Sequence, residues 1–97
     1  MKNGRYVKPD GTIEWYKDDL LHREDGPAIE WKDGDKYWYK NGLKHREDGP
    51  AVLFPNGNGW YYLNDVSYSE ENFKKYLLGK KLDKELELKE KFKRPKI

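Results

Sequence analysis

Alternation of apolar and polar residues predicts short β-strands in the first two thirds of the chain. Residues 28–31 (Ala-Ile-Glu-Trp) alternate as a half-buried strand does. Residues 36–39 (Lys-Tyr-Trp-Tyr) follow and are rich in aromatic side chains that favour strands. Asp33-Gly34 lies between the two segments and predicts a two-residue type I′ turn, in which both central residues have positive φ. The pattern therefore predicts an antiparallel β-hairpin.

This hairpin recurs because the chain repeats itself every 23 residues. The heptapeptide His-Arg-Glu-Asp-Gly-Pro-Ala occupies residues 22–28 and, unchanged, 45–51. The segments 6–28 and 29–51 match at 13 of 23 positions, and an incomplete third copy spans about 52–68. Turn-forming pairs recur in the same register at Asp10-Gly11, Asp33-Gly34, Asn56-Gly57, Asn41-Gly42 and, more weakly, Asn64-Asp65. Residues 1–68 thus predict an antiparallel meander of repeated β-hairpins.

Helical spacing replaces the alternation in the basic segment 69–97. A serine followed by two glutamates at 69–71 is typical of a helix N-terminus. Phe73, Tyr76 and Leu77 fall on one helical face, and Gly79 predicts the end of this first helix. We expect the helix to cover the open end of the last hairpin.

The final residues, 80–97, fit either a second helix or a strand. Residues 86–88 (Leu-Glu-Leu) alternate like a strand, but the abundance of Lys, Glu and Leu favours a helix. We expect residues 94–97 to be frayed. The predicted fold class is therefore mainly β with a C-terminal α part, the meander being capped by one or two short helices.

Composition narrows the function classes. Charged residues make up 39% of the chain, and aromatic residues, 15%, supply the bulk that a thin core needs. Residues 1–68 carry ten Lys or Arg and twelve Asp or Glu, while residues 69–97 carry ten and six. This imbalance is too small to predict nucleic acid as the partner. Without cysteine, a transmembrane segment or a secretory signal, we expect a cytoplasmic protein.

The heptapeptides are the first candidate for chemistry, because a histidine beside carboxylates can act in acid–base catalysis or bind a metal. A structural role is favoured, since successive repeats need identical joints whereas an active site needs one copy. We expect Arg23 and Arg46 to pair with Glu or Asp of the adjacent heptapeptide. The predicted structural motif comprises His22, Asp25, Gly26, Pro27, His45, Asp48, Gly49 and Pro50. No nucleophile pattern or phosphate loop is present, so we predict no enzyme, cofactor or metal site.

An aromatic band is the second candidate. Because neighbouring strand residues point to opposite faces, one set of aromatic side chains is expected near solvent in every repeat. Such a ladder is typical of a protein interface, although both faces could instead be partly covered. The predicted binding residues are Tyr16, Tyr37, Tyr39, Trp60, Tyr62, Arg23 and Arg46.

The period and its motif resemble the MORN repeat. Gly34, Trp38, Asn41, Gly42 and His45 stand at positions that match that family's unit, which is a β-hairpin. The chain departs from the family after the histidine, where it continues Arg-Glu-Asp-Gly-Pro-Ala. It is therefore similar to a divergent MORN-like "HREDGPA" repeat of small bacterial and phage proteins, over about residues 6–68. The resemblance implies a scaffold or partner-binding surface, and in some relatives a link to lipid.

Together these features predict a non-enzymatic protein-binding module. In its narrowest form it is a phage-encoded binder or inhibitor of a host defence protein, acting in the host cytoplasm. One alternative is a module that sequesters a small anionic ligand, such as a nucleotide, between aromatic rings and Arg23 or Arg46. The other is a peripheral lipid-binding scaffold of the MORN type. The partner's identity and the oligomeric state stay open.

Overall fold

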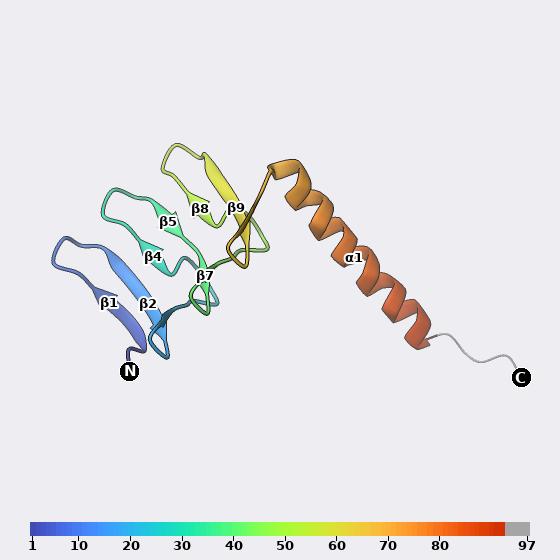
Figure 1. Ribbon diagram of the computed structural model, residues 1–97, viewed down its shortest axis with the longest axis horizontal. Coiled ribbons are helices and arrows are strands. Elements are labelled where there is room, and N and C mark those ends of the chain that lie inside the picture. The colour runs from blue at the N-terminus through green and yellow to red at the C-terminus, as the bar shows by residue number, and fades with distance from the viewer. Residues whose placement is uncertain (93–97) are drawn as a thin grey trace, which may run out of the picture.

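The structure is a computed structural model that describes residues 1–92, with side chains to residue 87, and it contains the predicted antiparallel meander (Figure 1). Its elements are β1 (Gly4–Val7), β2 (Ile13–Lys17), β3 (Leu20–Leu21), β4 (Ile29–Glu30), β5 (Lys36–Tyr37), β6 (Tyr39–Lys40), β7 (Leu43–Lys44), β8 (Val52–Leu53), β9 (Gly59–Leu63), β10 (Val66–Tyr68) and α1 (Glu70–Phe92). The predicted fraying of residues 94–97 lies outside the described residues.

Three hairpins, β1–β2, β4–β5 and β8–β9, lie side by side in one sheet. The sheet order is β1-β2-β4-β5-β8-β9-β10, with β3 paired to β2, while β6 and β7 form a separate two-stranded ladder. The pairs β2–β4 and β5–β8 join successive repeats. Each repeat therefore contributes one hairpin to the sheet and a second, shorter hairpin beside it.

The turns within the three main hairpins differ from the predicted type I′. Gly34 N–H donates to the Trp31 carbonyl at 2.9 Å, and Asp35 N–H donates to the Asp33 carboxylate at 3.1 Å. Gly34 has a φ of +100°, whereas Asp33 is not among the residues with positive φ. The loop is thus a β-turn followed by one left-handed glycine, a three-residue connection. The prediction was right about a hairpin and wrong about its turn.

Type I′ geometry occurs instead in the shorter hairpins. Asn41 and Gly42 have φ of 50° and 81°. Both central residues of the turns at 64–65 and 18–19 also have positive φ. The turn at Asp18-Asp19 was not predicted, because two aspartates are a weaker turn signal than Asn-Gly. All three repeats therefore carry both kinds of turn.

The core is thin, as the low apolar content requires. Its buried apolar side chains are Ala28, Ile29, Ala51, Val52, Leu63 and Phe73. Ile29 lies across from Glu14 on one side and Tyr37 on the other, and Val52 lies between Tyr37 and Trp60. Apart from Leu63 and Phe73, hydrophobic burial thus consists of one small residue pair at each joint between repeats.

A single helix, α1, follows the sheet. Ser69 Oγ accepts a hydrogen bond from Asn72 N–H at 3.1 Å, so the predicted N-cap is present. Phe73 is buried with its ring 4.7 Å from that of Tyr61. Beyond these first turns α1 projects away from the sheet (Figure 1).

The predicted helix end at Gly79 was wrong. Gly79 lacks the positive φ of a helix-terminating glycine, and α1 continues through it for 23 residues in total. Strong helix formers on both sides of Gly79 favour continuation over termination. The second predicted helix is consequently the distal half of the first.

Replacement of two glycines tests this geometry. A Cβ at Gly79 or at Gly57 would meet no atom within 4 Å, but only Gly57 has positive φ, at +89°. We expect Gly79→Ala to raise the free energy of unfolding by about 0.5–1 kcal/mol, since alanine loses less backbone entropy in a helix. Gly57→Ala should lower it by about 1 kcal/mol or more. Urea unfolding of both variants checks this, and destabilisation by Gly79→Ala would contradict a continuous helix.

Candidate functional site

Each heptapeptide folds around its own arginine. Arg23 Nε donates to Asp25 Oδ1 at 3.0 Å, and its Nη1 donates to the Pro27 carbonyl at 3.2 Å. Arg46 makes the same bonds to Asp48 and Pro50, at 2.7 and 3.1 Å. The predicted ion pairs between adjacent heptapeptides are therefore wrong. The aspartate two residues on and the carbonyl of the Gly-Pro bend both reach the arginine, so each pair forms within its own loop.

A tryptophan and a glycine enclose each guanidinium. Arg23 Cζ lies 4.3 Å from the centre of the Trp15 ring, and Arg46 Cζ lies 3.8 Å from that of Trp38. A Cβ added to Gly26 would stand 2.9 Å from Arg23 Cζ, so a larger residue at this position would require the guanidinium to move. In the third repeat Tyr61 takes the tryptophan position, and Phe73 of α1 packs on it. The helix thus supplies the group that the missing third arginine would have provided.

The histidines join one repeat to the next. His22 Nδ1 accepts the backbone N–H of Asn41 at 2.9 Å, 19 residues further on, and His45 Nδ1 accepts that of Asn64 at 3.1 Å. Because Nδ1 accepts, the ring proton is assigned to Nε2. His22 Nε2 lies 2.8 Å from Glu24, and this bond lowers the pKa of the Glu24 carboxyl. Each histidine ring therefore accepts a backbone hydrogen bond from the turn of the following repeat.

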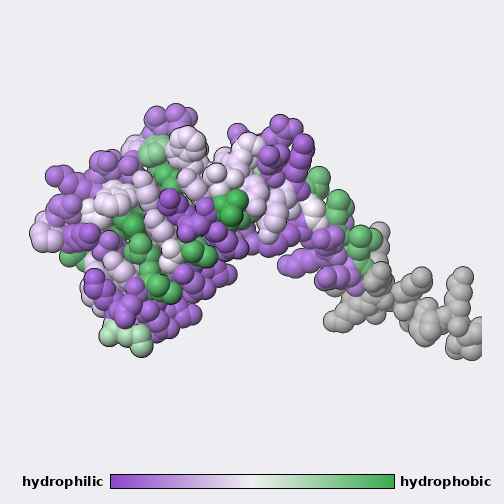
Figure 2. Space-filling model, in the orientation of Figure 1, coloured by the Kyte–Doolittle hydropathy of each residue, from purple (hydrophilic) through white to green (hydrophobic). Residues whose placement is uncertain are grey.

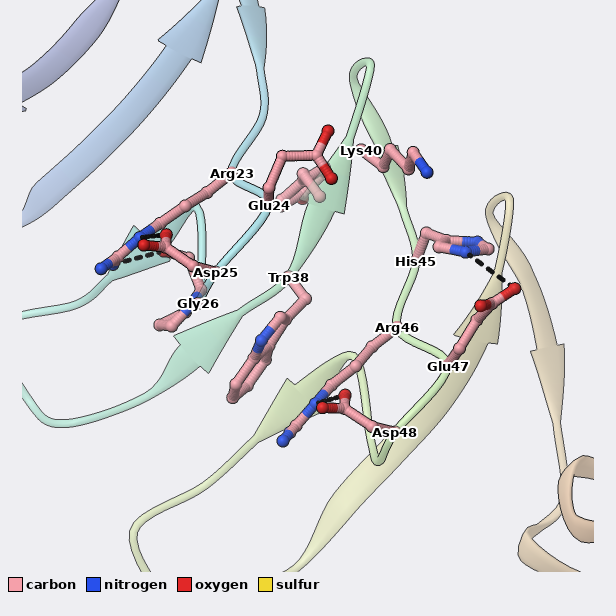
Figure 3. A pocket seen from close by; sticks show the side chains of 12 residues that line it. Arg23, Glu24, Asp25, Gly26, Trp38, Lys40, His45, Arg46, Glu47 and Asp48 are labelled. Carbon is pink, nitrogen blue, oxygen red and sulfur yellow. Dashed lines mark hydrogen bonds and ion pairs between the residues drawn. The ribbon is translucent and has the colours of Figure 1, made fainter. Parts of the chain in front are cut away.

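The two heptapeptides border a groove of about 630 Å³, in which Trp38 lies between the two Arg–Asp pairs (Figure 3). The carboxylates of Asp25 and Asp48 face solvent at its walls. The arginine side chains are only 22% and 21% exposed, and their donors are engaged by aspartate and carbonyl oxygens. The groove consequently presents its two aspartates more freely than its two arginines.

A second groove, the Trp60 groove, has a volume of about 560 Å³ and lies where the last hairpin meets α1. It is lined by Pro50, Phe54, Gly57, Asn58, Gly59, Trp60, Tyr61 and Glu70. Trp60 is 59% exposed, more than any other tryptophan of the chain. A Cβ at Gly59 would stand 2.6 Å from the Val52 carbonyl oxygen, so β9 lies tightly against β8 at this point. The exposed ring is therefore carried on a firmly packed strand.

The other predicted aromatic residues are half-buried. Tyr16 donates to Glu14 at 3.1 Å, and Tyr37 makes an edge contact with Trp31 at 5.8 Å. Burial raises the pKa of the Tyr39 hydroxyl. Lys44 Nζ stands 4.8 Å from the ring centre of Tyr62. Both faces of the sheet are thus partly covered, and among the five aromatic residues predicted to bind, Trp60 is the exposed one.

Two sets of exposed aliphatic side chains were missed. Leu20, Leu43 and Val66 occupy one register position in successive repeats and are all exposed. Their 23-residue spacing was the signal that could have found them. Leu78, Leu82 and Leu86 stand four residues apart on α1 and are exposed as well. Figure 2 shows apolar residues along the helix, set among hydrophilic ones.

Among the described residues, no group of three or more His, Asp or Glu side chains is placed to hold a metal ion. No helix within this part of the chain has the length and apolar character needed to cross a membrane. The candidate functional site therefore consists of the two grooves and the exposed side chains.

Removal of an enclosed guanidinium tests its structural role. Arg46→Ala should lower the free energy of unfolding by about 1–3 kcal/mol, because it removes two charge-assisted hydrogen bonds and the stack on Trp38. Arg46→Lys should recover only part of this loss, since an ammonium cannot make both bonds in the plane of the ring. Thermal and urea unfolding measure the effect. An Arg46→Ala variant as stable as the native chain would contradict this role.

The histidine joint predicts a pH dependence. Burial lowers the pKa of His45, Lys40 and Lys80 act in the same direction, and Glu47 opposes them. The folded state therefore binds fewer protons than the unfolded chain, so stability falls as the pH drops below about 6.5, the ordinary pKa of histidine.

His45→Asn is the matched control for this effect. Asn3 Oδ1 already accepts the N–H of Asp18 at 2.9 Å, so an amide oxygen can take the place of Nδ1. Between about pH 7.5 and about pH 5, urea unfolding should show a larger loss of stability for the native chain than for His45→Asn. Equal losses would rule out protonation of His45 as the cause.

Comparison with known proteins adds no relative: no family model matches the sequence, and neither the curated proteins nor the solved structures contain a match. The MORN-like resemblance therefore stays a prediction from the sequence. The candidate site rests on the geometry of the two grooves and of the exposed side chains.

Proposed function

We propose that this protein is a non-enzymatic protein-binding module with Trp60 as the main anchor. The observation that carries the proposal is the exposure of the Trp60 ring beside Phe54 and Tyr61 in the Trp60 groove. Tryptophan is among the residue types most often responsible for binding energy in protein interfaces. Such anchors act best from a rigid support, because less entropy is lost on binding.

The surroundings of Trp60 support this role. Trp60 pairs across the sheet with Val52, which is buried, and β9 continues into β10 and the start of α1. Glu70, at the first turn of α1, adds a charged group to the groove. An apolar centre with a polar rim is the usual anatomy of a protein interface. The groove therefore suits an apolar side chain of a partner.

The alternative of an anionic ligand gains no support from Arg23 and Arg46. Both guanidinium groups are already engaged by an aspartate, a carbonyl oxygen and a tryptophan ring. A phosphate would have to displace these contacts before it could bind. No specific contact favours the lipid-binding alternative either.

The narrower proposal is that the partner is a host defence protein, which a phage-encoded chain of this kind would inhibit in the host cytoplasm. It is supported by the resemblance to HREDGPA repeats of small bacterial and phage proteins. The identity of a captured partner decides between this role and a general scaffold.

Affinity capture from a bacterial lysate tests the function. The native chain should retain a stoichiometric protein, and Trp60→Ala should weaken this binding by about 30-fold or more, the usual cost of losing an interface anchor. Trp31→Ala is the matched control, since Trp31 is 38% exposed and lies outside the Trp60 groove. Both variants should unfold at similar temperatures. Equal binding by Trp60→Ala and the native chain would refute the anchor.

A further inference from the structure

The outer edge of β1 is the open end of the sheet. β1 is the outermost strand in Figure 1, and all four of its residues are exposed. The opposite end is different, since β10 follows β9 there and Phe73 of α1 packs on Tyr61. Within residues 1–92 no strand pairs with the outer edge of β1.

The backbone groups on this edge can be assigned. In the first hairpin Lys8 N–H donates inward to the Thr12 carbonyl at 2.8 Å. Hydrogen-bonding direction alternates along an antiparallel strand, so Tyr6 also faces inward. Arg5 and Val7 therefore direct their N–H and C=O groups away from β2.

The same edge is occupied in the other two repeats. Trp15 N–H donates to the Ala28 carbonyl, and Trp38 N–H donates to the Ala51 carbonyl, both at 2.7 Å. These bonds join β2 to β4 and β5 to β8 as antiparallel strands. Arg5 holds the register position of Ala28 and Ala51, 23 residues earlier. Its carbonyl is thus the equivalent acceptor, and no strand of the described residues lies beside it.

The N-terminal residues bind the short hairpin of the first repeat. Asp18 N–H donates to Asn3 Oδ1 and Asp19 N–H to the Lys2 carbonyl, at 2.9 and 3.0 Å. In the next repeat Asn41 and Gly42 make the corresponding bonds to His22 and Leu21. The short hairpin of the first repeat therefore has its partner, whereas the main hairpin lacks one.

We propose that the outer edge of β1 binds an extended, acidic segment of a partner protein as an added antiparallel strand. The geometry is the one by which β2 binds β4, and strand addition to a free edge is an established mode of peptide recognition. Arg5 on β1 and Lys2 before it carry positive charge at this end of the sheet, whereas Lys8 is paired with Glu14 at 3.4 Å. A second copy of β1 would bring the same cations together, so like charges oppose self-pairing.

This proposal shares with the proposed function only the premise that the partner is a protein. The outer edge of β1 and the Trp60 groove lie at opposite ends of the sheet, at its first strand and at β9. Each can therefore be disabled without the other. If Trp60→Ala captures the lysate partner as well as the native chain does while the peptide still binds, the proposed function alone fails. If Trp60→Ala loses capture but the peptide does not bind the native chain, strand addition alone fails.

The probe is a fluorescent peptide with the sequence of residues 12–17, the natural neighbour of such an edge, flanked on both sides by glutamates. Its binding to the native chain is measured by fluorescence anisotropy. A second peptide carries an N-methyl group on its tryptophan amide, the donor that would reach the Arg5 carbonyl. We expect the methylated peptide to bind about tenfold more weakly or worse, because it loses a backbone hydrogen bond and introduces a clash.

Val7→Pro and Val7→Thr form the matched protein pair. Val7 is 56% exposed and its N–H faces outward, so proline removes a donor that β2 does not use. Threonine alters the same side chain and keeps the donor. Val7→Pro should bind the acidic peptide about tenfold more weakly than Val7→Thr, with both variants folded by circular dichroism. Equal binding by the two would overturn strand addition.

Charge reversal tests the acidic character of the partner. Arg5→Glu should weaken binding of the glutamate-flanked peptide and strengthen binding of a lysine-flanked peptide. No change with either peptide would overturn the charge assignment. Analytical ultracentrifugation tests the other occupant: a dimer of the native chain that Val7→Pro dissociates would show that a second copy fills the edge, and would overturn the proposal.

Discussion

One side-chain hydrogen bond recurs at each joint between repeats, from the backbone of a type I′ turn to the Nδ1 atom of the preceding histidine. It lies beside the backbone pairs β2–β4 and β5–β8, which join the same repeats. The buried apolar contribution at each joint is an alanine followed by one β-branched residue. So small a core cannot orient successive hairpins by packing alone, because hydrophobic contact is not directional. The paired backbone strands and the histidine ring supply the direction, and the arginine enclosed between tryptophan and glycine fixes the bend that leads into the next strand.

Both ends of the array satisfy this arrangement with different residues. At the N-terminal end Asn3 takes the role of the histidine, and at the C-terminal end Phe73 packs where an arginine would lie. Asn3 and Phe73 differ in which part of the sheet they cover. Asn3 completes only the short hairpin and leaves the outer edge of β1 open, whereas α1 covers the last hairpin and leaves Trp60 exposed beside it. Both proposed binding surfaces therefore lie where the repeat pattern stops.

Most of the fold could be predicted from the sequence, and the errors share a cause. The hairpins and their 23-residue period followed from the two heptapeptides and the recurring turn residues. The turn at Asp33-Gly34, the helix end at Gly79 and the partners of Arg23 were mistaken. In each case the residue type permits two local geometries, and neighbouring residues select one. Leu20, Leu43 and Val66 were overlooked because the aromatic residues of the same repeats are more conspicuous.

The sequence by itself determined the period, the succession of antiparallel hairpins and the presence of a terminal helix, because these depend on spacing and on local turn chemistry. Tertiary structure decided which groups meet and which face solvent. Only the folded chain shows that the arginines are engaged within their own loops, that four aromatic residues of the band are half-buried and Trp60 is exposed, and that β1 has a free edge. Exposure and pairing depend on contacts between residues far apart in the chain. A repeat pattern predicts the same environment for equivalent positions of every repeat, whereas the first and last repeats each lack a neighbour on one side.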